Sequence, residues 1–183
     1  MTNYNIDKAK NVFNQANGFL KFIDESEFIA LNPMYQNPFY INCLLCCELY
    51  LKALLILDGK DEKYCKKMGH KLLDLFSGLK KEDQNQIKTI LQIVIDEDIF
   101  QYLDRINDDF IEMRYVYVNG ENIDAKEFNN NYAKTIGLMY RLQNYTSLKL
   151  YGRDTYEEVK NNAGIWRYKI WFYWRCRLRN NCR

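Results

Sequence analysis

An almost wholly apolar stretch is the feature that most constrains the fold. It runs FYINCLLCCELYLKALLILDGK from Phe39 to Lys60 and ends at Asp58-Gly59, a typical signal for a helix C-terminus. At about 20 residues it is long enough to cross a bilayer, but Glu48 and Lys52 lie in its middle, where each would be costly in lipid. The acid precedes the base by four positions, so the two can pair on one helix face. We therefore predict the central core helix of a bundle, not a membrane span.

Helical periodicity recurs along most of the chain, with apolar residues three or four positions apart. The sequence holds only two prolines, and the two Asn-Pro steps predict a turn over residues 31–39. Asp124 and Glu127 resemble a capping box, and YVYVNG at 115–120 predicts a local extended turn or hairpin. Helices are predicted at 6–23, 39–57, 81–95, 99–113 and 124–145, with short ones at 70–76 and after Thr155. We expect an all-α antiparallel four- or five-helix bundle over residues 1–150, with one or two short extra helices.

Residues 151–183 form a basic, aromatic C-terminal extension. From Lys160 onward there are seven basic residues and no acid, whereas the preceding 159 residues hold 19 basic and 24 acidic ones. Aromatic rings interleaved with arginine suit single-stranded nucleic acid, an anionic membrane surface, or simple packing of the rings on the bundle. The candidate RNA- or anion-binding residues here are Arg167, Lys169, Arg175, Arg177 and Arg179.

The six cysteines favour buried, reduced thiols. Three of them lie inside the apolar helix, and the N-terminal MTNYNIDKAK lacks the apolar region of a signal peptide, which predicts a cytoplasmic protein. Cys43 and Cys46 form one C-x-x-C pair, but the chain has no second such pair and a single histidine. We therefore expect no zinc site, no other metal and no cofactor.

Four motifs in a fixed order resemble the HEPN superfamily of small helical bundles. They are the Glu-x-x-x-Lys core helix CELYLKALL, the short helix GHKLLDLF, the long helix LDRINDDFIEMRYVY, and a further amphipathic helix. The resemblance covers roughly residues 6–148 and implies a dimer-forming α-bundle. Many HEPN proteins are metal-independent ribonucleases of toxin–antitoxin, phage-defence or restriction systems.

The active site that the resemblance implies is Arg-x(4–6)-His, near the end of the long helix, with two copies facing each other across a dimer. Histidine moves a proton and arginine stabilises the charge on the phosphate. Arg114 fits the arginine, but residues 115–120 contain no histidine. Asn119 has a matching offset, although a carboxamide does not exchange protons near pH 7 as imidazole does.

His70, the only histidine, matches the Gly-His corner instead. We expect a structural role for it, with binding and catalysis as alternatives. Arg114 either pairs with an acid such as Asp109, Glu112 or Glu48, or binds an anion. Glu48 and Lys52 are expected to form a polar network in the core.

The predicted function is a HEPN-like, nuclease-inactive or divergent module. It would bind RNA, a nucleotide or a cognate protein partner as a homodimer, in a prokaryotic defence or toxin–antitoxin context. The alternatives are an active metal-independent endoribonuclease that uses Arg114 and His70, and a purely structural dimerisation domain.

Overall fold

The computed structural model describes residues 3–25, 33–113 and 125–152. Within these ranges the secondary structure is helical and no strand occurs, so the all-α prediction is confirmed. Arg114, the predicted turn at 115–120 and every basic residue of the C-terminal extension lie outside the described residues. The labelled helices are α1 (Asn3–Glu25), α2 (Pro33–Leu57), α3 (Glu62–Met68), α4 (Leu72–Ser77), α5 (Lys81–Leu91), α6 (Ile99–Arg105) and α8 (Ala125–Tyr151).

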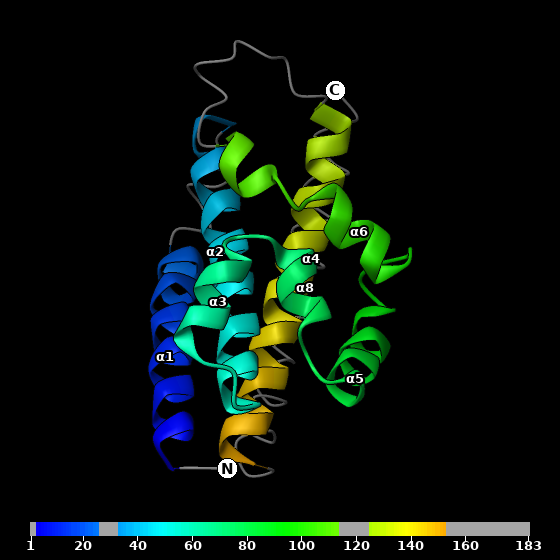
Figure 1. The fold of residues 1–183 in the computed structure, drawn as a ribbon. Coiled ribbons are helices and arrows are strands. Elements are labelled where there is room, and N and C mark those ends of the chain that lie inside the picture. The colour runs from blue at the N-terminus through cyan, green and yellow to red at the C-terminus, as the bar shows by residue number, and fades with distance from the viewer. Residues whose placement is uncertain (1–2, 26–32, 114–124, 153–183) are drawn as a thin grey trace.

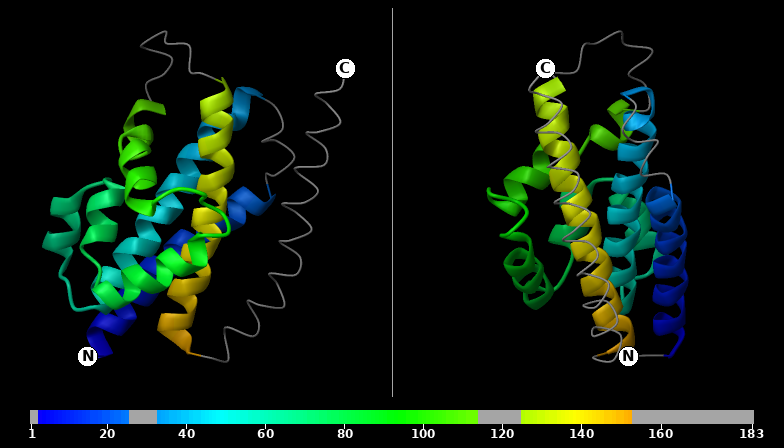
Figure 2. Two further views of the ribbon diagram at one scale, coloured as in Figure 1. Left: turned by 90° about the vertical axis from the view of Figure 1, so that its right-hand side faces the viewer. Right: turned by 180° about the vertical axis from the view of Figure 1, so that it is seen from behind.

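Helices α1, α2 and α8 are the longest of the described part of the chain and make its frame (Figure 1). Helices α1 and α2 are antiparallel neighbours, and α8 packs against α2 and runs in the same direction. The short helices α3 to α6 cover a side of this frame, as the turned views make clear (Figure 2). Helix α2 therefore has neighbours on most of its circumference, which explains why its sequence is apolar nearly all round.

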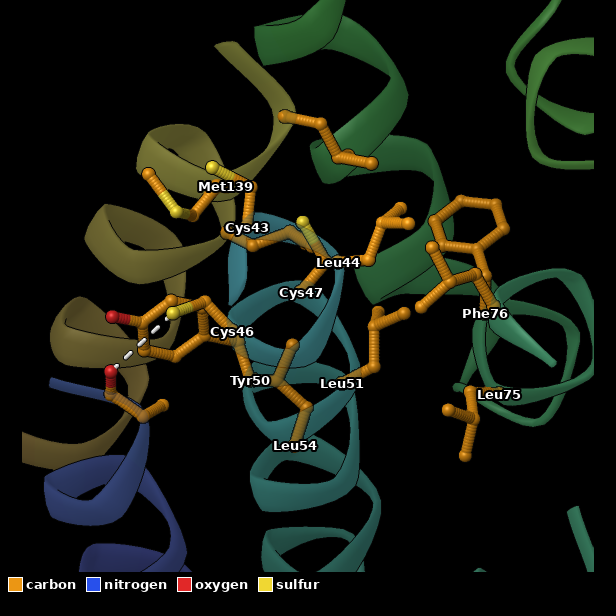
Figure 3. Packing of buried hydrophobic residues seen from close by; sticks show 14 of the residues in the cluster. Cys43, Leu44, Cys46, Cys47, Tyr50, Leu51, Leu54, Leu75, Phe76 and Met139 are labelled. Carbon is orange, nitrogen blue, oxygen red and sulfur yellow. Dashed lines mark hydrogen bonds between the residues drawn. The ribbon is translucent and has the colours of Figure 1, made fainter. Parts of the chain in front are cut away.

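The core is built around α2. Its side chains spread outward to meet Leu75 and Phe76 of α4 and Met139 of α8 (Figure 3). On the α1 side, the Cys46 thiol donates to the carbonyl of Ala16 at 3.5 Å. Residues 37–57 are long and apolar enough to cross a membrane by length and composition, but most of this segment is buried inside the bundle. These contacts confirm the predicted core helix.

Four cysteines, Cys43, Cys46, Cys47 and Cys65, are buried free thiols, as expected for reduced cysteines. Burial raises the pKa of the Cys46 thiol to about 12 and the pKa values of Cys43 and Cys47 well above the ordinary value. The thiolate is the nucleophilic form, so these side chains act as small apolar core residues.

Two boundary predictions were wrong. Of the predicted turn at 31–39, residues 33–39 are the first part of α2, which begins at Pro33 and contains Pro38, and residues 31–32 lie outside the described residues. Proline suits the first helical position, where its missing N–H has no partner in any case. Pro38 forfeits a backbone hydrogen bond, and the Asn42 side-chain amide donates to its carbonyl at 2.8 Å.

The predicted helix at 99–113 is also interrupted. Helix α6 ends at Arg105, residues 106–108 form a turn, and helix resumes at 109–113. In the turn the backbone N–H of Asn107 bonds to Asp104 and that of Asp109 to Ile106, three positions back rather than four. The apolar spacing continues through the break, because Ile106 and Phe110 are both buried.

The segment between α5 and α6 is fixed to α8 by charge and by close packing. The Glu97 carboxylate forms ion pairs with Arg105 at 2.6 Å and with Lys134 of α8 at 2.9 Å. These contacts lower the pKa of the Glu97 carboxyl to about 2. Val94 packs over Gly137 so closely that a Cβ at position 137 would overlap a methyl group of Val94. A larger residue at position 137 would therefore displace this segment.

Candidate functional site

His70 lies in the turn between α3 and α4. Gly69 ends α3 with a φ of 63°, a conformation that glycine adopts without strain, and this redirects the chain toward α2. The turn places His70 Nδ1 2.8 Å from Glu48 Oε2, across 22 positions of sequence. Lys52 Nζ lies 2.7 Å from Glu48 Oε1, so the structure pairs these two residues as their spacing indicates. We call Glu48, Lys52, His70 and the adjoining Phe110 the His70 site.

The three polar side chains of the His70 site differ steeply in exposure. The exposed fraction of the side chain is 4% for Glu48, 17% for Lys52 and 49% for His70. Each carboxylate oxygen of the buried Glu48 has a nitrogen partner, Lys52 Nζ on Oε1 and His70 Nδ1 on Oε2. A buried charge needs such partners, because an unpaired one is costly. The carboxylate of Glu48 thus lies in the core, and the imidazole that it contacts lies partly at the surface.

The Glu48 contact also decides which nitrogen of a neutral His70 imidazole carries the hydrogen. A carboxylate only accepts hydrogen bonds, so Nδ1 of His70 must carry the hydrogen. Nε2 is then the acceptor in neutral imidazole and a second donor in the cation. Among the residues that the structure describes, none is hydrogen-bonded to Nε2. This nitrogen, on a half-exposed ring, can meet a ligand or a reacting atom.

Phe110 forms a wall of the site. Its ring stacks on the imidazole with centroids 4.8 Å apart and an angle of 27° between the planes. The same segment is fixed to α4, because the side-chain oxygen of Asn107 accepts the backbone N–H of Leu73 at 3.2 Å. Arg114 follows Phe110 by four positions and lies outside the described residues. His70 thus lies beside the segment that leads to the arginine of the predicted motif.

Four lysines that were not predicted as site residues lie close to His70 in the sequence. Lys63, Lys66, Lys67 and Lys71 are all exposed on α3 and the turn that follows it. The acid nearest to them in α3, Glu62, is paired with Lys8 at 2.8 Å. The available signal was the composition of EKYCKKMGHK, in which four lysines and the histidine fall within ten positions. We call Lys63, Lys66, Lys67 and Lys71 the α3 lysines.

No group of three or more His, Cys, Asp or Glu side chains that could hold a metal ion occurs in the part of the chain that the structure describes. The side chains that the His70 site does offer are an imidazole, a carboxylate, an ammonium group and an aromatic ring.

The fold and the site together define a helical-bundle domain with a polar site anchored in its core helix. A family model described as the HEPN domain matches residues 33–160, from the start of α2 to beyond α8. The match covers well over half of the chain, and the protein belongs to the HEPN family. No curated protein and no solved structure matches the chain.

Proposed function

We propose that this protein is a HEPN module that binds RNA at the His70 site and has little ribonuclease activity of its own. The observation that carries the proposal is the half-exposed imidazole, fixed by Glu48 and Phe110, with the exposed α3 lysines within seven positions of it in the chain. A flat, half-exposed ring in a lysine-rich segment suits a nucleotide, because the ring offers stacking and lysines meet phosphates. A nucleotide or a protein partner is the alternative ligand.

We propose that Arg114 and the basic residues of the C-terminal extension also contribute to RNA binding through their charge. Arg114 suits a phosphate because guanidinium binds its oxygens bidentately. Arg167, Lys169, Arg175, Arg177 and Arg179 add charge without dictating sequence preference. We further propose a cytoplasmic homodimer in a defence or toxin–antitoxin setting, which rests on family membership.

Weak cleavage is expected for a chemical reason. Residues 115–120 offer tyrosine, valine, asparagine and glycine, and none of these titrates near neutrality. Tyrosine, with a reference pKa of about 10, is a poor base at pH 7. The chain has one imidazole per subunit to serve as both base and acid.

The second candidate is an active metal-independent endoribonuclease, and the Glu48–His70 contact favours it. A carboxylate that holds Nδ1–H of a histidine orients the ring and leaves Nε2 to move a proton. Arg114 would then stabilise the charge on the phosphate.

The test compares wild type, His70→Ala and Arg114→Ala on a single-stranded RNA oligonucleotide in EDTA. Binding is followed by fluorescence anisotropy and cleavage by gel. Lys67→Ala should lower the slope of log affinity against log salt by about one, whereas the exposed Lys21→Ala on α1 should leave it unchanged. Binding without cleavage, weakened by His70→Ala, supports the module. Cleavage that both substitutions abolish in folded protein supports the nuclease, and absence of RNA binding by wild type refutes both.

A further inference from the structure

A buried chain of hydroxyl groups connects three helices to the segment that carries Phe110. Tyr102 of α6 and Thr135 of α8 lie 2.7 Å apart through their hydroxyl oxygens. Thr135 donates to the Tyr40 hydroxyl at 3.4 Å, and Tyr40 donates to Asp109 Oδ2 at 2.6 Å. Tyr40, Tyr102 and Thr135 are all fully buried. These hydroxyl groups lead to the carboxylate of Asp109, directly before Phe110 in the sequence.

The last hydrogen bond of this chain has a fixed direction. The Asp109 carboxylate can only accept, so the Tyr40 hydroxyl must donate its hydrogen there and accept from Thr135. Burial raises the pKa of Tyr40 far above its ordinary range, with the Asp109 charge as a further cause, so the phenol keeps its hydrogen. A hydroxyl that donates to a carboxylate makes a shorter and stronger bond than a neutral pair does.

This bond lies where the backbone alone does not fix the geometry. Residues 106–108 break the helix between α6 and 109–113, so the direction of the following turn is not set by helix continuity. Among the described residues, Asn107 attaches this segment to the backbone of α4, and Asp109 attaches it to Tyr40 of α2. Phe110, next in the chain, carries its ring onto the imidazole of His70.

We infer that Tyr40 and Asp109 are positioning residues that hold the Phe110 ring against His70 and so fix the imidazole for its ligand. The consequence for RNA rests on the proposed function, whereas the consequence for the imidazole does not. Glu48 fixes one nitrogen of the ring, and Phe110 covers one face. Without the Tyr40–Asp109 bond, we expect the imidazole of His70 to keep its contact with Glu48, and the Phe110 ring to shift relative to the imidazole.

The single histidine makes the test direct, because its imidazole proton signals in an NMR spectrum need no further assignment. Tyr40→Phe removes one hydroxyl and no ring. Tyr50→Phe is the matched control, since Tyr50 is also fully buried on α2 and donates one hydrogen bond, to Asn17 of α1 at 2.8 Å. A ring stacked at 4.8 Å displaces the imidazole signals upfield. We expect Tyr40→Phe to move them toward unstacked values and Tyr50→Phe to leave them in place.

RNA affinity supplies the second measurement. The loss of one positioning hydrogen bond should weaken binding about three- to tenfold in Tyr40→Phe, with Tyr50→Phe within about twofold of wild type. Unchanged imidazole signals in Tyr40→Phe overturn the inference. Displaced signals in a protein whose wild type does not bind RNA uphold the positioning role and refute the proposed function. If Tyr40→Phe does not fold, Asp109→Ala removes the acceptor of the same hydrogen bond and is measured in the same way. Asp109 is only half-buried, so its replacement should disturb the core less.

Discussion

Substitution of Glu48 by alanine tests whether the buried acid of α2 is an integral part of the fold. The side chain is 4% exposed and holds Lys52 at 2.7 Å and His70 at 2.8 Å. Alanine would leave the ammonium of Lys52, itself only 17% exposed, without its acceptor. The imidazole would lose the partner of Nδ1 but could hydrate, because half of it faces solvent.

The expected cost follows from these exposures. Removal of one partner of a fully buried ion pair costs about 3–5 kcal/mol. Lys52 can move its amine toward solvent on a flexible stem, which reduces that figure. The lost methylene adds about 0.8 kcal/mol. We expect Glu48→Ala to lower the free energy of unfolding by about 2–4 kcal/mol.

Urea unfolding at neutral pH and constant protein concentration measures this loss. Glu62→Ala is the surface control, because Glu62 also pairs with a lysine at 2.8 Å but is largely exposed, and its loss should be far smaller. Glu48→Met combined with Lys52→Met should recover most of the stability, since no buried charge is left unpaired. A loss below about 0.5 kcal/mol in Glu48→Ala would refute the reasoning.

Three further outcomes are expected. Gly137→Ala should cost about 1–3 kcal/mol in urea unfolding and be partly restored by Val94→Ala, whereas Gly18→Ala, with open space around it, should stabilise by about 0.5–1 kcal/mol. Glu97 has a folded-state pKa of about 2, below its ordinary value of 4.5, so its contribution is complete above that ordinary value and is lost as pH falls toward 2. Glu97→Gln should therefore cost about 1–2 kcal/mol at pH 7, allowing for solvent screening, and this difference should shrink below pH 4.5 and vanish as pH falls through about 2, as urea unfolding at several pH values would show. Light scattering at micromolar concentration should give about twice the chain mass of 22.1 kDa, and a monomer would exclude a site shared across a dimer.

Periodicity located the helices well, and its errors have local causes. Helices α1, α2 and α5 follow from their apolar spacing, because burial on one face or all round dictates that spacing. The Asn-Pro steps misplaced the start of α2, since proline suits the first helical position, where Pro33 lies, and α2 continues through Pro38 at the cost of one backbone hydrogen bond. The regular positions of Ile106 and Phe110 concealed the break between them, because a turn of similar pitch keeps both in the core.

The His70 site was only partly predictable. The pairing of Glu48 with Lys52 follows from a spacing of four within one helix. The approach of His70 to Glu48 depends on how the turn after α3 folds back, and no local pattern encodes that distance. The α3 lysines were not predicted as site residues, because exposed lysines are common on the surface of any soluble protein. They become candidates for anion binding only because His70 lies among them in the sequence.

Glu48 raises the question of why an acid occupies a core position that an apolar residue could fill. Lys52 alone balances its charge, so His70 is not needed for neutrality. An apolar replacement of the buried pair would pack as well and often raises stability. It could not, however, hold Nδ1–H of His70 or direct Nε2 outward. Glu48→Met with Lys52→Met separates the two roles, because it should restore the fold while the imidazole loses its fixed orientation. If that variant binds RNA as wild type does, the buried acid serves the fold alone.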